Sequence, residues 1–174
     1  AKSDNTPHLF FINGKRIEIY FFPSVGASTQ IENMIGSQTN KSINFAIYAF
    51  TRFNISNKMK SQYNPPTKMV RGVFDASQSS AGGVYEEMKG LGGQTPWNPS
   101  APVYLENQTG LLHSKYMLID ADLMTSNPIV QTGSFNYSNN VPLYIGSSAC
   151  GFFPGSLDET RIWNVARTSY EIQQ

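Results

Sequence analysis

A chain of 174 residues with a formal net charge of +1 is long enough to bury one sizeable core, so we expect one main domain. Hydrophobic residues make up 40% of the chain, which excludes a disordered protein, and the near-zero charge excludes affinity for nucleic acid through a generally basic surface. The single cysteine, Cys150, excludes an intramolecular disulfide. No apolar run approaches the ~20 residues that cross a bilayer, so we expect no membrane span.

Metal-ligating residues are scarce in this sequence. The chain has two histidines, His8 and His113, and no Cys/His cluster with zinc-ligand spacing, so we expect neither a metal nor a cofactor. Residues 1–7 show no signal-peptide pattern and are expected to be either a trimmed mature terminus or an artificial end. The location therefore stays open, with a secreted or periplasmic protein among the alternatives.

The first predicted elements are a hairpin and a helix. Leu9–Ile12 and Ile17–Phe22 flank Asn13-Gly14, a pair that favours a two-residue turn with positive φ. The helix is expected after Thr29, which stands three residues before Glu32 in capping-box spacing. Its apolar face would consist of Ile31, Met34 and Ile35.

The rest of the chain alternates between strand and helix patterns. The segment Ile43–Thr51 is apolar almost throughout and predicts a strand buried on both faces. The other expected elements are helices at 55–60 and 84–91, strands at 70–75, 111–120 and 129–132, and a loop at 94–102. This order predicts a mixed α/β (α+β) fold, in which helices flank a central β-sheet.

Four polar side chains are expected at one end of two neighbouring strands. Alternation on a strand places His113 and Lys115 on one face, and the small-residue turn that follows the next strand carries Ser134 and Asn136. Lysine, serine and asparagine can hold a phosphate group, and histidine can attack phosphorus or transfer a proton near neutral pH. Asp120 has the opposite parity, so we expect it at the strand end in a supporting role. These residues predict a phosphate site.

The pattern His113-x-Lys115-x4-Asp120, followed by a Gly-Ser-x-Asn turn at 133–136, resembles the HKD signature of the phospholipase D superfamily. The resemblance covers roughly residues 15–138 and implies a phospholipase D-like sheet. It also implies that the histidine attacks a phosphodiester and forms a covalent phosphohistidine, while the histidine of a second motif protonates the leaving oxygen. The chain has one motif, and short single-motif members are nucleases that build the site across a homodimer. We therefore expect a homodimeric, metal-independent endonuclease acting on nucleic acid or on another phosphodiester.

The C-terminal segment departs from that family. Residues 142–174 resemble the closing strands and helix of a laminin-G or concanavalin-like jelly roll, so we expect domains at 1–141 and 142–174. About thirty residues cannot form such a sandwich alone, and we favour the interpretation that this tail completes the nuclease sheet. Glu159 would then support the catalytic histidine. The candidate catalytic residues are His113, Lys115, Asp120, Ser134, Asn136 and Glu159.

Two other functions remain as alternatives. A phospholipase is disfavoured because such enzymes carry both motifs in one long chain and no amphipathic basic helix is evident. A non-catalytic binding module, lectin-like or nucleic-acid-binding, would use a degenerate phospholipase D-like scaffold. Two further features could serve such binding. One is a set of aromatic residues that either stack on bases or pack in the core, namely Trp97, Tyr104 and Tyr137. The other is the segment 77–83, which either holds a phosphate group or forms a loop, and we favour the loop.

Overall fold

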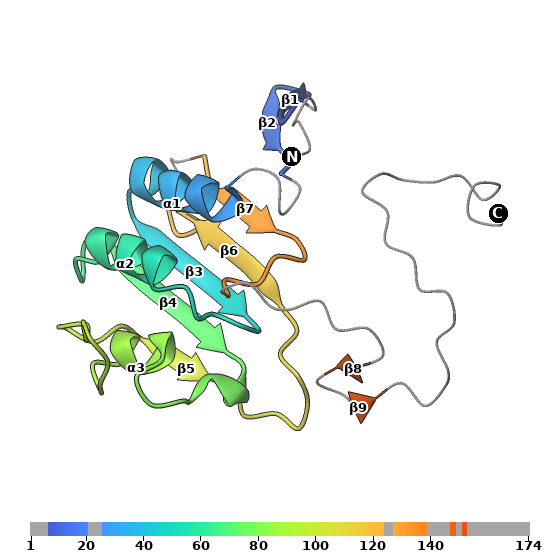
Figure 1. Cartoon of the computed structure of the whole chain (residues 1–174). Coiled ribbons are helices and arrows are strands. Elements are labelled where there is room, and N and C mark those ends of the chain that lie inside the picture. The colour runs from blue at the N-terminus through green and yellow to red at the C-terminus, as the bar shows by residue number, and fades with distance from the viewer. Residues whose placement is uncertain (1–6, 21–25, 124–126, 139–146, 149–150, 153–174) are drawn as a thin grey trace, which may run out of the picture. The chain divides into compact units, whose positions relative to one another are not determined.

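A computed structural model of the chain describes residues 7–20, 26–123, 127–138, 147–148 and 151–152. The chain divides into two compact units, residues 7–139 and a second unit made of residues 1–6 and 140–174. The first unit contains a five-stranded sheet with the strand order β5-β4-β3-β6-β7 (Figure 1). Its strands are β3 (Ser42–Ile47), β4 (Met69–Phe74), β5 (Val103–Leu105), β6 (Lys115–Ile119) and β7 (Ile129–Thr132).

The sheet is mixed, with three parallel strands followed by two antiparallel ones. Strand β3 pairs with β4, and β4 with β5, in parallel, while β6 runs antiparallel to both β3 and β7. Consequently β3 and β4 end on the side of the sheet on which β6 begins. This side is formed by strand ends, and it is the edge meant below wherever an edge of the sheet is named. This arrangement confirms the predicted mixed α/β class.

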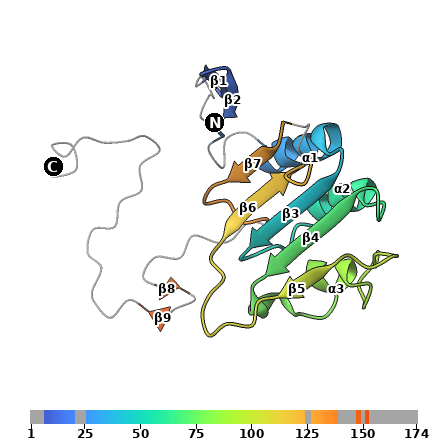
Figure 2. The same cartoon turned by 180° about the vertical axis from the view of Figure 1, so that it is seen from behind.

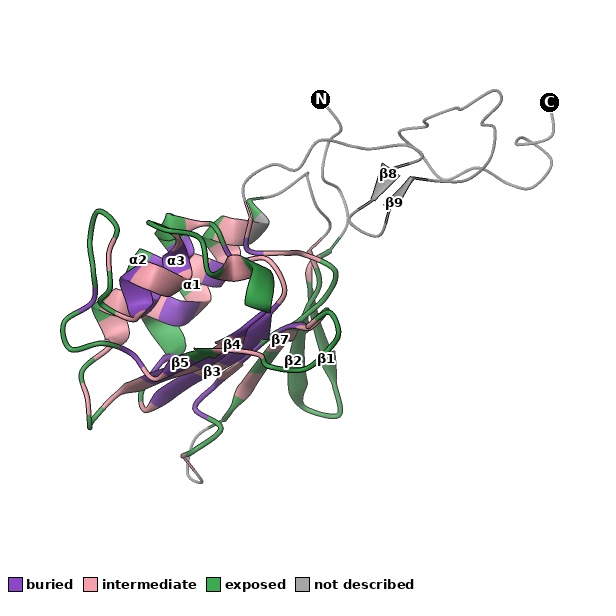
Figure 3. Ribbon diagram, turned by 90° about the horizontal axis from the view of Figure 1, so that it is seen from below, coloured by how far each residue is buried: buried purple, intermediate pink, exposed green. Residues whose placement is uncertain are grey.

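All three α-helices of the described residues lie on one face of the sheet, and the view from behind shows the other face (Figures 1 and 2). They are α1 (Ala27–Gln38), α2 (Phe53–Gln62) and α3 (Val84–Met88). The core fills the space between the helices and the sheet, where buried residues line both layers (Figure 3). Its aromatic centre consists of Phe45, Phe50, Phe74 and Tyr137, whose rings pack edge-to-face or stacked at 5.2–5.7 Å.

The hairpin and the first helical face are confirmed, but the predicted helix cap is wrong. Strands β1 (Leu9–Ile12) and β2 (Lys15–Glu18) pair around Asn13 (φ 48°) and Gly14 (φ 73°), as the turn requires. Helix α1 begins at Ala27, two residues before Thr29, and has no side-chain cap hydrogen bond. Gly26 occupies the N-cap position instead.

Several strand predictions need correction. The strand expected at 43–51 ends at Ile47, and the one expected at 17–22 is Lys15–Glu18. The strand expected at 111–120 begins at Lys115, because the backbone N–H of Leu112 donates to the Asp75 carboxylate (2.9 Å) instead of joining the sheet. The segment Val103–Leu105, which directly follows the predicted loop, forms the edge strand β5. Its three residues are too few to show a periodic pattern. Strand β7 has the predicted bounds.

The second unit contributes two short paired strands to the described residues. They are β8 (Ser147–Ser148) and β9 (Gly151–Phe152), which run antiparallel. The closing strands expected within residues 142–174 lie largely outside the described residues, and the terminal helix lies entirely outside them. The domain boundary at residue 141 stays a prediction.

Candidate active site

The predicted phosphate-binding residues lie at the edge where β3 and β4 end. Lys115, the first residue of β6, is directly opposite Ile47, the last residue of β3. At the end of β7, Thr132 is opposite Tyr116, so the turn that carries Ser134 and Asn136 leaves the sheet from this same edge. The topology thus brings both halves of the sequence motif to one edge.

Lys115 and His113 meet around Tyr48, the residue that follows β3. The Lys115 side chain is only 9% exposed; its Nζ donates to the His113 carbonyl oxygen (3.0 Å) and lies 5.4 Å from the centre of the Tyr48 ring. The same ring lies 5.3 Å from the His113 imidazole. Burial lowers the pKa of Lys115 below its ordinary value, because it disfavours the charged form. His113 precedes β6 by two residues, so its place is not set by strand alternation, and its imidazole contacts the Tyr48 ring.

A buried aspartate holds the segment in front of His113. Asp75, at the end of β4, accepts hydrogen bonds from the backbone N–H of Leu112 (2.9 Å) and from the N–H (2.9 Å) and hydroxyl of Ser77 (2.5 Å). Burial raises the pKa of this carboxyl, but the three hydrogen bonds favour the ionised form, and the net pKa lies below its ordinary value. Asp75 therefore fixes the path of the chain into His113.

Backbone hydrogen bonds attach the second half of the motif to the end of β3. The N–H groups of Thr51 and Arg52 both donate to the Tyr137 carbonyl oxygen, at 2.7 and 2.9 Å. The Tyr137 side chain is fully buried, which raises the pKa of its hydroxyl, and that hydroxyl donates to Gln131. The neighbouring Asn136 has a buried side-chain oxygen without a hydrogen-bond partner among the described residues. Such a group is available to a donor on a bound ligand.

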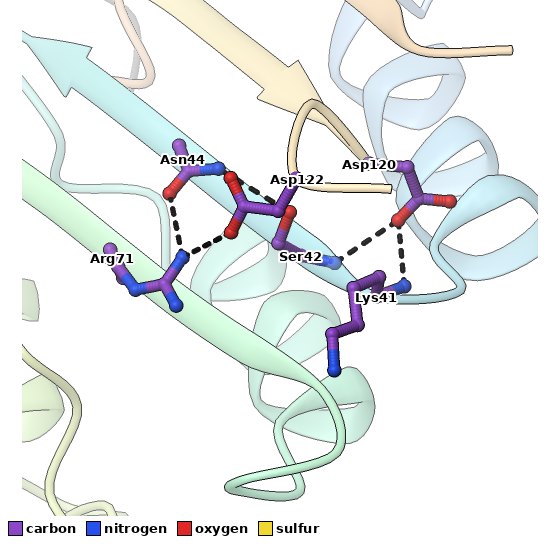
Figure 4. Close-up of polar contacts among 6 residues, drawn as sticks. All are labelled: Lys41, Ser42, Asn44, Arg71, Asp120 and Asp122. Carbon is purple, nitrogen blue, oxygen red and sulfur yellow. Dashed lines mark hydrogen bonds and ion pairs between the residues drawn. The ribbon is translucent and has the colours of Figure 1, made fainter. Parts of the chain in front are cut away.

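Asp120 lies at the opposite end of β6. Five residues at a rise of ~3.3 Å per residue separate it from Lys115 by about 16 Å along the strand. Its carboxylate accepts hydrogen bonds from the backbone N–H groups of Lys41 (2.7 Å) and Ser42 (3.1 Å) at the start of β3 (Figure 4). It also accepts from the backbone N–H (3.0 Å) and the side chain (3.0 Å) of Asn40. Burial raises the pKa of Asp120, but these hydrogen bonds outweigh burial and lower it. Asp120 thus joins β3 to the end of β6 and does not face the His113 edge.

The remaining candidate residues differ in their exposure to solvent. Ser134 is exposed after Gly133, whose φ of 153° suits glycine. Of the predicted stacking residues, Trp97 and Tyr137 are buried in the core, whereas Tyr104 is 61% exposed. Glu159 lies outside the described residues. Sequence reasoning missed Tyr48, although its position at the end of a buried strand was a usable signal.

Metal-ligating side chains do not cluster in the part of the chain that the structure describes: no group of three or more His, Cys, Asp or Glu residues could hold an ion there. No helix among the described residues is long and apolar enough to cross a membrane.

Comparison with known proteins agrees with this fold. Residues 31–141 match the family described as cardiolipin synthase, PLD-like domain. The structure is also similar to that of a phospholipase D family member, Nuc from Salmonella typhimurium, with 21% identity and a TM-score of 0.52 over 67% of this chain and 68% of that one. No curated protein sequence matches the chain. The family match spans more than half of the sequence, so the chain belongs to the PLD-like family, as the motif predicted.

Proposed function

We propose that the protein is a metal-independent phosphodiesterase, and specifically an endonuclease that cleaves DNA or RNA through a phosphohistidine on His113. The observation that carries the proposal is the contact of His113 and Lys115 around Tyr48, at the edge that also bears the 133–136 turn. A nucleophile, a cation and hydrogen-bonding groups are the components that phosphoryl transfer requires.

In the proposed first step, a neutral His113 ring nitrogen attacks phosphorus. A P–N bond forms, the bond from phosphorus to the leaving oxygen breaks, and the leaving oxygen takes a proton from the His113 of a second copy. Water then attacks the phosphohistidine and gives its proton back to that second histidine, which restores both side chains. Lys115, Ser134 and Asn136 stabilise the negative charge on the non-bridging oxygens.

Buried charge makes Lys115 effective in this role. Lys115 is buried, with 9% of the residue exposed, and its ammonium group contacts one carbonyl oxygen and one aromatic face, so solvent screens the charge weakly. A phosphodiester anion that enters the site gives this charge its counterion.

The second histidine is the reason for proposing a homodimer. The chain has one His-x-Lys motif, and its other histidine, His8, is followed by Leu-Phe rather than by a lysine two positions on. A two-fold axis near the His113 edge would place two identical motifs opposite each other. Light scattering over a concentration series tests this arrangement, and full activity from a monomer would contradict it.

The direct test is hydrolysis of bis(p-nitrophenyl) phosphate and of plasmid DNA in excess EDTA. We expect wild type to cleave both, His113→Ala to lose activity by at least ~100-fold, and the matched control His8→Ala to retain it. Trapping of a covalent phosphoryl group on wild type but not on His113→Ala would support the intermediate. A folded wild type without activity would reject the proposal and favour a binding module on the same scaffold.

A further inference from the structure

A ring-sized hollow lies at the edge that carries His113. It has a volume of about 140 Å³ and is lined by the residues that follow β3 and by those between β4 and α3. Strands β3 and β4 end side by side (Figure 1), so the hollow opens where both strands leave the sheet. Neither the catalytic motif nor the proposed mechanism uses these residues.

The walls of the hollow combine aromatic and polar groups. Phe53, the first residue of α2, is 38% exposed and presents its ring, while Val84 and Phe50 form buried apolar walls. The Gln78 side-chain oxygen accepts from the Phe50 N–H (3.1 Å), which leaves the N–H groups of that carboxamide as donors. Ser80 adds an exposed hydroxyl. A planar ring with polar edge atoms fits this set of groups better than an acyl chain does.

The volume of the hollow matches the size of one ring. A protein cavity of about 150 Å³ holds one benzene molecule, so the 140 Å³ of this hollow match a single six-membered ring. Gly82 keeps one side open, because a Cβ there would meet no atom within 4 Å.

The hollow is also close to the reactive edge. Thr51, which lines it, is three residues from Tyr48, so their Cα atoms are about 10 Å apart at most. The Thr51 N–H donates to the carbonyl oxygen of Tyr137, the residue after Asn136. A nucleotide adjacent to a phosphodiester at His113 can therefore place its base over this part of the edge.

From these observations we infer that the hollow is a subsite for a single-ring pyrimidine base, which stacks on Phe53 and accepts hydrogen bonds from Gln78. The inference rests on the proposed phosphodiesterase function and deepens it, because it names the nucleotide that the site prefers. Stacking of one base on an aromatic side chain changes affinity by about 5- to 150-fold when the ring is removed.

The kinetic test compares esters that share one leaving group. These are the p-nitrophenyl phosphodiesters of thymidine (the 5′ and the 3′ ester), of deoxyadenosine and of methanol. We expect kcat/KM for one thymidine ester to exceed that for the deoxyadenosine and methyl esters by at least ~5-fold, and Phe53→Leu to abolish this preference while leaving the methyl ester unaffected. The matched control Tyr104→Leu, an exposed aromatic residue on β5, should preserve it. Equal rates for all esters would overturn the subsite and leave the phosphodiesterase function standing.

A binding measurement keeps the inference testable if no ester is cleaved. Fluorescence anisotropy of the full chain compares oligo(dT) with an abasic oligomer of equal length. Tighter binding of oligo(dT), lost in Phe53→Leu but not in Tyr104→Leu, would support the subsite even though catalysis had failed. Equal binding of the two oligomers by wild type would overturn it.

Discussion

Replacement of Asp120 by asparagine tests whether this residue holds the sheet together. The carboxylate accepts from three consecutive backbone N–H groups, of Asn40, Lys41 and Ser42, and is 2% exposed. A hydrogen bond to a charged group contributes about 1.5–3 kcal/mol. Asparagine keeps one acceptor oxygen, loses the charge and turns an N–H₂ group toward the remaining N–H donors. We therefore expect Asp120→Asn to lower the free energy of unfolding by about 3 kcal/mol, a large part of the ~5–15 kcal/mol of a typical domain.

The pH dependence of this loss gives the second part of the test. Hydrogen bonding lowers the pKa of Asp120 in the folded protein below its ordinary value of 3.8, despite burial. Its ionised form therefore contributes full stability above about pH 4, and that contribution is lost as the pH falls through the lower, folded pKa. The difference between wild type and Asp120→Asn should be constant from pH 5 to pH 7 and should shrink below pH 4.

Urea unfolding followed by circular dichroism measures both quantities, with Asp122→Asn as the matched control. Asp122 lies two residues further on and pairs with Arg71 (2.5 Å), but both side chains are about 40% exposed, so this pair contributes ~0–1 kcal/mol (Figure 4). An Asp120→Asn loss no larger than that of the control at pH 7 would refute the reasoning, as would a difference that persists unchanged to pH 2.

Two further substitutions test the site and the core. Tyr48→Leu removes the ring that both His113 and Lys115 contact. We expect a fall of about 10-fold or more in kcat on bis(p-nitrophenyl) phosphate, rescued by Tyr48→Phe. Normal activity of the leucine variant would exclude the positioning role. Gly72→Ala would place its Cβ 2.2 Å from the Phe45 ring, so we expect a loss of about 1–3 kcal/mol and a lower Tm by calorimetry, whereas Gly110→Ala, which meets no atom within 4 Å, should leave Tm unchanged.

The sheet could be predicted from the sequence because its signals are local. The Asn-Gly turn determines the first hairpin, and the apolar run at β3 predicts a strand buried on both faces, where only Asn44 is partly exposed. Strand β7 is bounded by a proline and a glycine turn, and its limits agree with the prediction. In each case the residues that determine the element lie within it or next to it.

The geometry of the site could not be predicted in this way, because long-range contacts produce it. The strand pattern at 111–120 places His113 inside a strand, but the bond from Leu112 to Asp75, 37 residues away, takes this segment out of the sheet. The contact with Tyr48 depends on the antiparallel register of β3 and β6, which no local pattern encodes. The motif therefore indicated which residues form the site, but not the contacts that position them.

The two ends of the strands differ in what their buried aspartates hold in place. At one edge, Asp75 holds the segment before His113, and the N–H groups of Thr51 and Arg52 hold the segment after Asn136, so both halves of the motif are attached to the ends of β3 and β4. At the other edge, about 16 Å away, Asp120 binds the start of β3 and contacts none of these groups. A substitution at Asp120 should therefore change stability without changing kcat of the folded fraction. One at Asp75 should displace His113 and lower kcat even where the protein stays folded.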